Sequence, residues 1–291
     1  MKWPPEERQF SSWADLAAAL TTDALSEHRY YRGTLPEWDL ETSLERALND
    51  WGLPLSDAPR AEWALLRDFK RGFLPVAEYA PPHDDDVVGW LALMQHHGAP
   101  TRLLDWTYSP FVAAYFAVEA LLSVRRSTRA VVWAIPCSAF DSPGDLVSPP
   151  AAKELIQKFC DHRDGESFSG LFFKHDPRLS FVLPVNPSVL NQRLIIQQGV
   201  FLAPGNVTIP FMQNLEAAAT CAADGQPIKY IIDRSAIRDA MHHLRRMNMT
   251  RASLFPGLDG YAQNLRLLTR FYGKDVVYTG TEKDTYPAVG G

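Results

Sequence analysis

A polar stretch between two apolar segments organises this chain, and it reads Gln95-His96-His97-Gly98-Ala99-Pro100-Thr101-Arg102-Leu103-Leu104-Asp105-Trp106-Thr107-Tyr108-Ser109-Pro110. The residues before it predict a helix over 87–97 that ends at Gly98, because glycine suits the position after a helix C-terminus. Ser109 and Pro110 open the next helix as N-cap and first-turn proline. That helix, to about residue 122, is apolar on nearly every side and is therefore expected to be buried.

Polar groups of several kinds crowd into this stretch, and such groups are costly to bury unless they are paired or used. We expect Arg102 and Asp105 to pair across a turn. Thr107 and Ser109 lie at a helix N-terminus, where free backbone N–H groups favour an anion or a ligand hydroxyl. The alternative is an internal polar network that only fixes the connection between the two helices.

Outside this stretch, helices dominate the first half of the chain and strands the second, an order that favours an α+β fold. We predict further helices over 12–20 (opened by a Ser12–Asp15 capping box), 42–50, 60–79, 235–247 and 258–272, and strands over 27–34, 130–135, 180–183, 193–202 and 228–233. The chain is interpreted as one domain over 1–291. It is helix-rich over 1–125 and strand-rich over 126–234, with C-terminal helices over 235–272 and a tail over 273–291.

The bulk composition indicates a globular protein, with 46% hydrophobic residues in a chain of 291. No run of about 18 uncharged apolar residues occurs, so no membrane-spanning helix is expected. The first residues lack a basic region followed by an apolar one, so no signal peptide is expected. Cys137, Cys160 and Cys221 fit neither a disulfide framework nor a zinc-ligand spacing. Together these features favour a cytoplasmic protein.

Several common catalytic motifs are absent, among them GxxxxGK, GxGxxG, HExxH and GxSxG. No metal site is expected either. His96 and His97 are adjacent on a helix and face different directions. The three aspartates at 84–86 are interpreted as a solvated loop that caps the following helix.

The central stretch resembles the core of the FRG domain, a family named after a Phe-Arg-Gly triplet. The similarity covers residues 95–107, Ser109-Pro110 and the string Ala114-Tyr-Phe-Ala-Val-Glu119. Tyr31-Arg32-Gly33 matches the triplet with tyrosine in place of phenylalanine. The closing segment Ser253-Leu-Phe-Pro-Gly-Leu-Asp-Gly260 is also similar to the end of many members, so the resemblance extends over about 30–265.

A more distant resemblance is to mono-ADP-ribosyltransferases of the Arg–Ser–Glu type, which place three motifs in a fixed order. Tyr31-Arg32-Gly33-Thr34 resembles the first, and Thr107-Tyr108-Ser109 before an Ala/Phe-rich helix resembles the second. Gln197-Gln198-Gly199 before an apolar string ending at Pro204 resembles the third. The resemblance implies a split central β-sheet, with an N-terminal helical region packed on it, and NAD as the substrate.

The roles that such residues have in this family imply a role for each motif of this chain. An arginine fork binds the NAD pyrophosphate bidentately. The following glycine lets the backbone approach, so that its amide reads the nicotinamide carboxamide. Hydroxyl groups orient the strand and the ribose. The resemblance makes Arg32, Asp105, Ser109 and Gln198 catalytic, and makes Tyr31, Arg32, Gly33, Thr34, His97, Thr101, Arg102, Thr107 and Ser109 the residues that bind NAD.

The chain departs from this pattern where the family has a glutamate, since Gln197, Gln198 or Gly199 occupies that position. A glutamine hydrogen-bonds the ribose 2′-hydroxyl but brings no negative charge, a loss on the order of 10²–10³ in rate. Either another carboxylate substitutes, with Asp105 the first candidate and Glu119 the next, or Gln198 acts, or the protein binds without turnover. The structural alternatives are a salt bridge for Arg32 and a solvent-facing strand position for Gln198.

The resemblances together imply an NAD-dependent ADP-ribosyltransferase that acts inside the cell as a bacterial toxin or antiphage effector. Its acceptor would be a protein or a nucleic acid, and an antitoxin would be a further partner. The net charge of −5 gives no global attraction to nucleic acid, but residues 234–246 form a local basic stretch. The alternative is a non-catalytic module that binds a nucleotide or a partner in the same cleft. A hydrolase built on Ser109, His97 and Asp105 is disfavoured, because the serine lacks a nucleophile elbow.

Overall fold

The computed structural model describes residues 3–36, 38–77, 79–124, 128–140, 150–162, 164–174, 179–221 and 226–268. The contacts group into two compact units, residues 1–249 and 250–291, and the single domain expected over 1–291 stays a prediction. The division follows Asn248, which ends a helix with a left-handed φ of 59°. In the second unit α11 (Arg251–Leu254) and α12 (Leu258–Leu268) pack on each other. The predicted tail over 273–291 lies outside the described residues.

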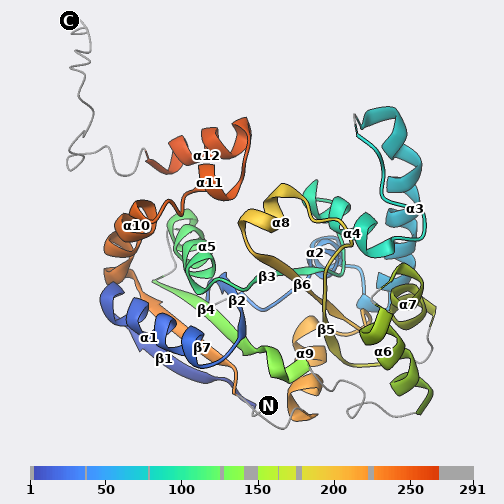
Figure 1. The fold of residues 1–291 in the computed structure, drawn as a ribbon, viewed down its shortest axis with the longest axis horizontal. Helices are drawn as coiled ribbons and strands as arrows, with labels where there is room; N and C mark the ends of the chain where they lie inside the picture. The colour runs from blue at the N-terminus through green and yellow to red at the C-terminus, as the bar shows by residue number, and fades with distance from the viewer. Residues whose placement is uncertain are drawn as a thin grey trace, which may run out of the picture. The chain divides into compact units, whose positions relative to one another are not determined.

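The first unit is built on one mixed sheet, so the predicted α+β class is confirmed (Figure 1). Its strands are β1 (Glu6–Phe10), β2 (Arg29–Thr34), β3 (Leu104–Thr107), β4 (Arg129–Pro136), β5 (Val182–Val185), β6 (Gly199–Pro204) and β7 (Ile228–Asp233). They lie in the order β1-β7-β4-β2-β3-β6-β5. Only β1 and β7 run parallel; the other neighbours are antiparallel.

The sheet is nearly divided in its middle. β2 pairs with β4 along its whole length, from Arg29 opposite Pro136 to Thr34 opposite Val131. Towards β3, however, β2 has a single registered pair, Tyr31 opposite Thr107. The sheet therefore consists of two halves, β1-β7-β4-β2 and β3-β6-β5, that meet at one point.

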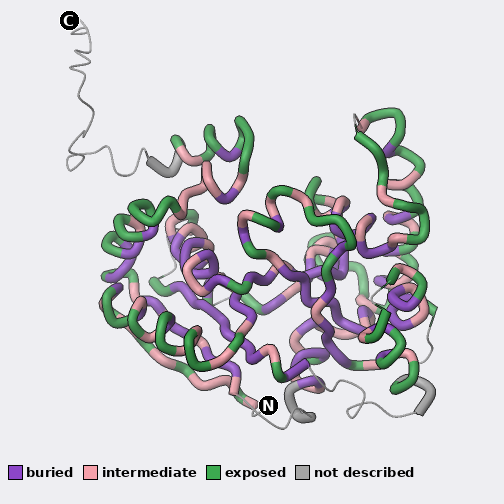
Figure 2. The backbone as a smooth tube through the Cα atoms, in the orientation of Figure 1, coloured by how far each residue is buried: buried purple, intermediate pink, exposed green. Residues whose placement is uncertain are grey.

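Helices cover both faces of the sheet. They are α1 (Trp13–Ser26), α2 (Ser43–Asp50), α3 (Ala58–Val76), α4 (Val87–His96), α5 (Pro110–Ser123), α6 (Pro150–His162), α7 (Gly165–Ser169), α8 (Gln192–Ile196), α9 (Phe211–Cys221) and α10 (Ile237–Arg246). One core cluster joins α3, α4, α6 and α7 to β5 and β6, and a second joins α9 to β2, β3 and β4. Figure 2 shows the buried residues concentrated in the strands and in α5.

The buried helix predicted after Ser109 is confirmed as α5, which lies over β2 and β4. Ser109 is its N-cap, accepting from the Val112 N–H, and Pro110 occupies its first turn. Close packing on β2 is possible because β2 carries Gly33. A Cβ at Gly33 would stand 2.0 Å from the carbonyl oxygen of Ala113 and 2.4 Å from the amide of Ala117. The glycine is thus required by the helix, and that face of the strand is not open to a ligand.

Local signals explain most differences from the predicted elements. The strand predicted over 193–202 is wrong in its first half, because Asn191 caps the short helix α8 through the Leu194 N–H at 2.8 Å. The capping box predicted at Ser12 is also wrong, since that side chain makes no cap hydrogen bond. β1, α6, α7 and α9 are not among the elements predicted from the sequence. Asp86 does cap α4, as the aspartate loop predicts.

Replacing Gly33 tests the packing of α5. We expect Gly33→Ala to lower the free energy of unfolding by about 1–3 kcal/mol, because the new methyl group meets backbone atoms that cannot rotate away. Gly72→Ala is the matched control. Gly72 lies in α3, and a Cβ added there would have no atom within 4 Å, so alanine is expected to be neutral or stabilising by up to about 1 kcal/mol. Urea denaturation of the two variants gives both values; equal stabilities would contradict this packing.

A buried carboxyl joins α2 to α9 and predicts a pH dependence of stability. Glu45 accepts from the Thr42 N–H at 3.3 Å and from the Phe211 N–H at 3.2 Å. Burial raises the pKa of Glu45 to about 7. Since the folded pKa lies above the unfolded one, this contribution is complete below about pH 4 and is lost as the pH rises through about 7.

We therefore expect Glu45→Gln to remove part of the fall in unfolding free energy between about pH 4.5 and 7. The measurement is a urea-denaturation series across that range for both proteins. Parallel pH profiles would show that Glu45 is not the titrating group.

Candidate functional site

Arg32 bridges the two halves of the sheet. It lies on β2 opposite Trp133 of β4, and its Nη1 donates to the backbone oxygen of Asp105 on β3. Burial lowers the pKa of Arg32 to about 10, while the Asp105 carboxylate acts in the opposite direction. The guanidinium therefore remains cationic at neutral pH, next to a carboxylate at the point where the sheet divides.

The carboxylate of Asp105 is held by Gln95 at the end of α4. The amide nitrogen of Gln95 donates to Asp105 Oδ2 at 3.0 Å and to the Leu103 carbonyl at 3.3 Å. Its amide oxygen accepts from Thr101 Oγ1 at 2.7 Å and from Ser43 Oγ at 3.0 Å. Both donors and both acceptor positions are used, so the orientation of the amide is fixed and with it that of the carboxylate.

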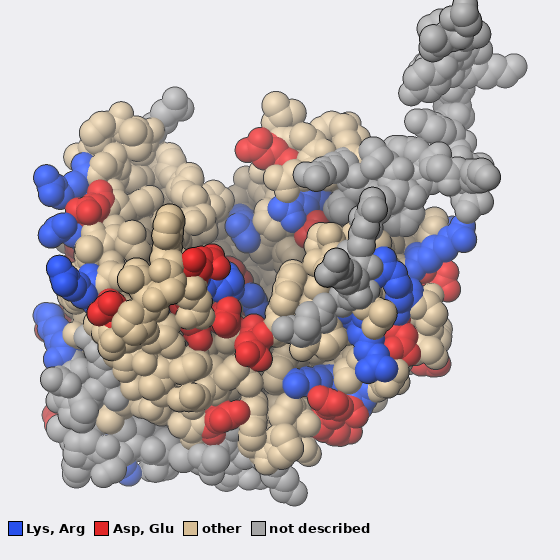
Figure 3. Space-filling model, turned by 180° about the vertical axis from the view of Figure 1, so that it is seen from behind, with Lys and Arg blue, Asp and Glu red and all other residues tan. Residues whose placement is uncertain are grey.

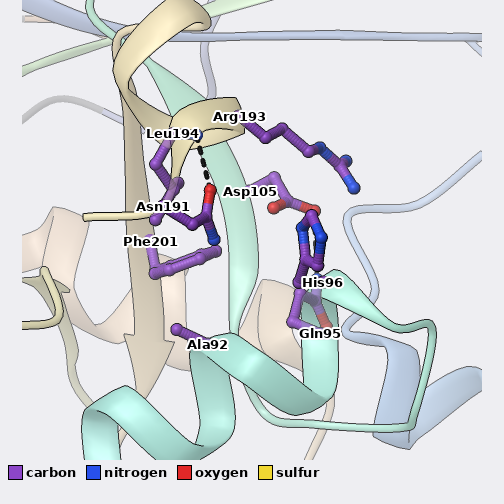
Figure 4. Close-up of a pocket in the computed structure, with 8 residues that line it drawn as sticks. All are labelled: Ala92, Gln95, His96, Asp105, Asn191, Arg193, Leu194 and Phe201. Carbon is purple, nitrogen blue, oxygen red and sulfur yellow. Dashed lines mark hydrogen bonds between the residues drawn. The ribbon is translucent and has the colours of Figure 1, made fainter. Parts of the chain in front are cut away.

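Asp105 also lines a small open pocket between α4, α8, β3 and β6 (Figure 4). The lining residues are Ala92, Gln95, His96, Asp105, Asn191, Arg193, Leu194 and Phe201. The pocket is open to solvent and encloses little space, so a dinucleotide would extend well beyond it. Partial burial lowers the pKa of His96, and His97 and Arg193 add to that shift.

The third motif lies beside β3, and the contacts are made by its backbone. Thr107 Oγ1 donates to the Gln197 carbonyl at 2.7 Å, and the Tyr108 N–H donates to the Gln198 carbonyl at 3.0 Å. Gln198 has a left-handed φ of 47° in the turn between α8 and β6, and its side chain is exposed. The expected strand position is wrong, because the strand begins only at Gly199.

The hydroxyl groups of the second motif stabilise the turn into α5. Thr107 Oγ1 accepts from the Ser109 N–H at 3.0 Å, and Ser109 Oγ accepts from the Val112 N–H at 3.3 Å. Both residues are buried. In the part of the chain that the structure describes, no hydrogen bond joins Ser109, His97 and Asp105, so the arrangement does not favour the hydrolase alternative.

Arg102 is not available to a ligand, and the expected pairing with Asp105 is wrong. Its side chain is completely buried and forms a bidentate ion pair with Glu62 of α3. The Glu62 side chain is likewise 0% exposed. Arg102 Nε donates to Glu62 Oε1 at 2.8 Å. Nη1 donates to the carbonyls of Phe172 at 3.1 Å and Pro204 at 3.4 Å. The guanidinium carbon lies 4.5 Å from the ring centroid of Phe173.

The remaining predicted residues are dispersed. Thr101 is buried, and its hydroxyl donates to the side chain of Gln95. Thr34 is buried on β2. His97 is exposed, and its Nε2 lies 2.8 Å from Tyr79 Oη. Tyr31 is buried, and burial raises its pKa to about 12. Of the predicted set, only Arg32 and Asp105 come together as charged side chains at the division of the sheet.

Several residues of this region are not assigned by the sequence. Gln95 lies within the motif without a predicted role. Asn191 and Arg193 precede or begin a predicted strand. Glu62 has a usable signal, since it shares the buried face of α3 with Leu66. An acidic residue on an apolar helix face requires a buried partner, and Arg102 is that partner.

Comparison with known proteins identifies part of the chain. Residues 27–125 match the model of the FRG domain. This chain contains an FRG domain. The match includes Arg32, Gln95 and Asp105 and ends before β4, so the predicted extension to about residue 265 stays a prediction. No curated protein and no solved structure matches the chain.

The described residues offer neither a metal site nor a membrane span. No group of three or more His, Cys, Asp or Glu side chains in the described ranges is arranged to hold a metal ion. Within those same ranges, no helix combines the length and apolar character needed to cross a membrane.

The buried pair of the FRG domain predicts a large stability effect. Arg102→Met leaves the carboxylate of Glu62 buried without a partner, which we expect to cost about 3–5 kcal/mol of unfolding free energy. The double variant Glu62→Leu/Arg102→Met removes both charges and is expected to recover much of that loss. Arg71→Met, at an exposed position on α3, is the control and should change stability by less than about 0.5 kcal/mol. Additive losses in the double variant would contradict a direct pair.

Proposed function

We propose that this protein is an NAD-dependent ADP-ribosyltransferase whose reacting carboxylate is Asp105. The observation that carries the proposal is the hydrogen bond from Arg32 to the backbone oxygen of Asp105, across the single point where the two halves of the sheet meet, which brings the guanidinium near the Asp105 carboxylate. A cation that binds pyrophosphate and an anion that stabilises a developing positive charge are both needed for this chemistry. Here they lie on neighbouring strands.

The order of the motifs in space supports the same proposal. β2, β3 and β6 carry the first, second and third motif and are consecutive in the sheet. This agrees with a split-sheet transferase, in which the substrate lies where the strands diverge. The pocket beside Asp105 is open to solvent, and Ala92, Leu194 and Phe201 give it apolar walls against which a planar ring would lie.

The reaction would break the bond between the ribose C1′ and the nicotinamide nitrogen. Nicotinamide leaves with the bonding electron pair, and a nucleophile of the acceptor forms the new bond to C1′ and releases its proton to solvent. Asp105 would stabilise the oxocarbenium-like charge by hydrogen-bonding the ribose 2′-hydroxyl, and Arg32 would hold the pyrophosphate. Gln95 would act as a positioning residue, since it fixes the Asp105 carboxylate. We place this activity in the cytoplasm, as that of a toxin or antiphage effector.

A non-catalytic nucleotide-binding module is the second candidate. It is favoured by the exposed turn position of Gln198 and by the use of the Thr107 and Ser109 hydroxyls in internal hydrogen bonds. These groups would give NAD fewer contacts than the transferase pattern requires. The pocket and Arg32 would still allow binding.

Nicotinamide release and label transfer test the two candidates together. Purified protein is incubated with NAD labelled in its adenylate half and with cell lysate. We expect release of nicotinamide and a labelled product. Asp105→Asn should lower kcat about 10²–10³-fold, because the isosteric amide keeps the shape and loses the charge. Arg32→Lys should mainly raise KM, because an ammonium cannot bind pyrophosphate as a fork.

Gln198→Ala is the matched control, and we expect activity within a few-fold of the wild type. NAD binding by calorimetry without nicotinamide release would favour the second candidate. Absence of both binding and release would overturn the two together.

A further inference from the structure

α3 exposes three arginines on one line along its length. Arg60, Arg67 and Arg71 are separated by seven and four residues, so they project within a narrow sector of the helix. At about 1.5 Å per residue, the line is roughly 16 Å long. Trp63 and Leu74 lie directly beside it and are 44% and 73% exposed. These five residues are called the α3 arginine stripe.

The opposite face of α3 is the one that packs on the core, through Leu66, Phe73 and the buried Glu62. The stripe is therefore the outward face of a helix whose orientation is fixed by the core. Figure 3 shows basic side chains following one another down the left edge of the molecule, which corresponds to the right edge, formed by α3, in Figure 1. A chain with a net charge of −5 thus presents a local positive surface here.

The positive charge of the stripe is little compensated. Among the described residues, the one ion pair along it joins Arg67 to the adjacent Asp68 at 3.0 Å, and both side chains are more than 60% exposed. Such a surface pair is weak and easily exchanged for a stronger anion. Lys70 lies at the margin of the stripe and is paired with Asp84 at 3.0 Å.

We propose that the α3 arginine stripe binds the backbone of single-stranded nucleic acid. Arginine forks bind phosphate oxygens bidentately, and a line of about 16 Å spans several successive phosphates. The indole of Trp63 is half exposed next to the arginines, and it provides a surface on which a base stacks. An acidic protein segment would match the charge of the stripe, but its carboxylates would not stack on the Trp63 indole.

The stripe and the candidate site are joined through α4. α3 packs on α4, and Tyr79, just after α3, contacts His97 at the end of α4 through a 2.8 Å hydrogen bond. His96, the neighbour of His97, lines the pocket. A nucleic-acid strand held along α3 would therefore lie on a helix that packs on α4, and α4 lines the pocket. Binding by the stripe does not require ADP-ribosyl transfer, so each proposal can fail alone.

Fluorescence anisotropy with labelled single-stranded DNA and RNA, each about 20 nucleotides long, tests the proposal, using the full chain without NAD. We expect binding in the micromolar range at about 0.1 M salt, weakening by a log–log slope of about −2 when three phosphates are neutralised. The variant Arg60→Glu/Arg67→Glu/Arg71→Glu should lose detectable binding. Trp63→Ala should weaken binding about 5- to 100-fold while leaving the salt slope unchanged.

The matched control is Arg238→Glu/Arg245→Glu/Arg246→Glu on α10, which makes the same change in net charge on another exposed basic helix face. It should bind as the wild type does. The neutral variant Arg60→Gln/Arg67→Gln/Arg71→Gln should also lose binding, and it tests the proposal if the charge-reversed variant does not fold. Urea denaturation checks that each variant is folded. No binding by the wild type, equal loss in the α10 variant, or full competition by polyglutamate would each overturn the proposal.

Discussion

The ion pair between Arg102 and Glu62 is the constraint around which one half of the molecule is arranged. Both side chains are 0% exposed, so the pair is stable only while every remaining donor of the guanidinium has an acceptor. Two of those acceptors, both for Nη1, are the carbonyls of Phe172 and Pro204, which lie far apart in the chain. The pair therefore fixes α3, the start of β3 and the end of β6 against one another.

This arrangement explains why so few of the polar groups in the central stretch are free for chemistry. Arg102 is used in the core, Thr101 orients Gln95, and Thr107 and Ser109 close the turn into α5. What these contacts produce is a rigidly placed carboxylate at Asp105. The sequence left an internal polar network as the alternative to a functional site. In the structure this network supports the candidate site.

The sequence predicted the parts of the fold whose signals are local. α4 and α5 follow from caps, a terminal glycine and a proline, and those signals need no knowledge of the rest of the chain. The partner of Arg102 could not be derived in the same way. Asp105 is three residues away and Glu62 forty, and only the packing of α3 decides between them. Likewise, nothing near β2 indicates that Gly33 serves α5 instead of a ligand.

Of the residues proposed for the site from the sequence, Arg32 and Asp105 lie close together, because β2 and β3 are neighbours in the sheet. Their role in a site stays a prediction. The sequence did not indicate in the same way which residue of this chain takes the place of the family's glutamate. At the start of β6 the backbone of Gln197 and Gln198 is engaged with β3 and the turn that follows it, and the Gln198 side chain is exposed. A negative charge at this division of the sheet is available from Asp105 on β3, whose carboxylate Gln95 holds in place.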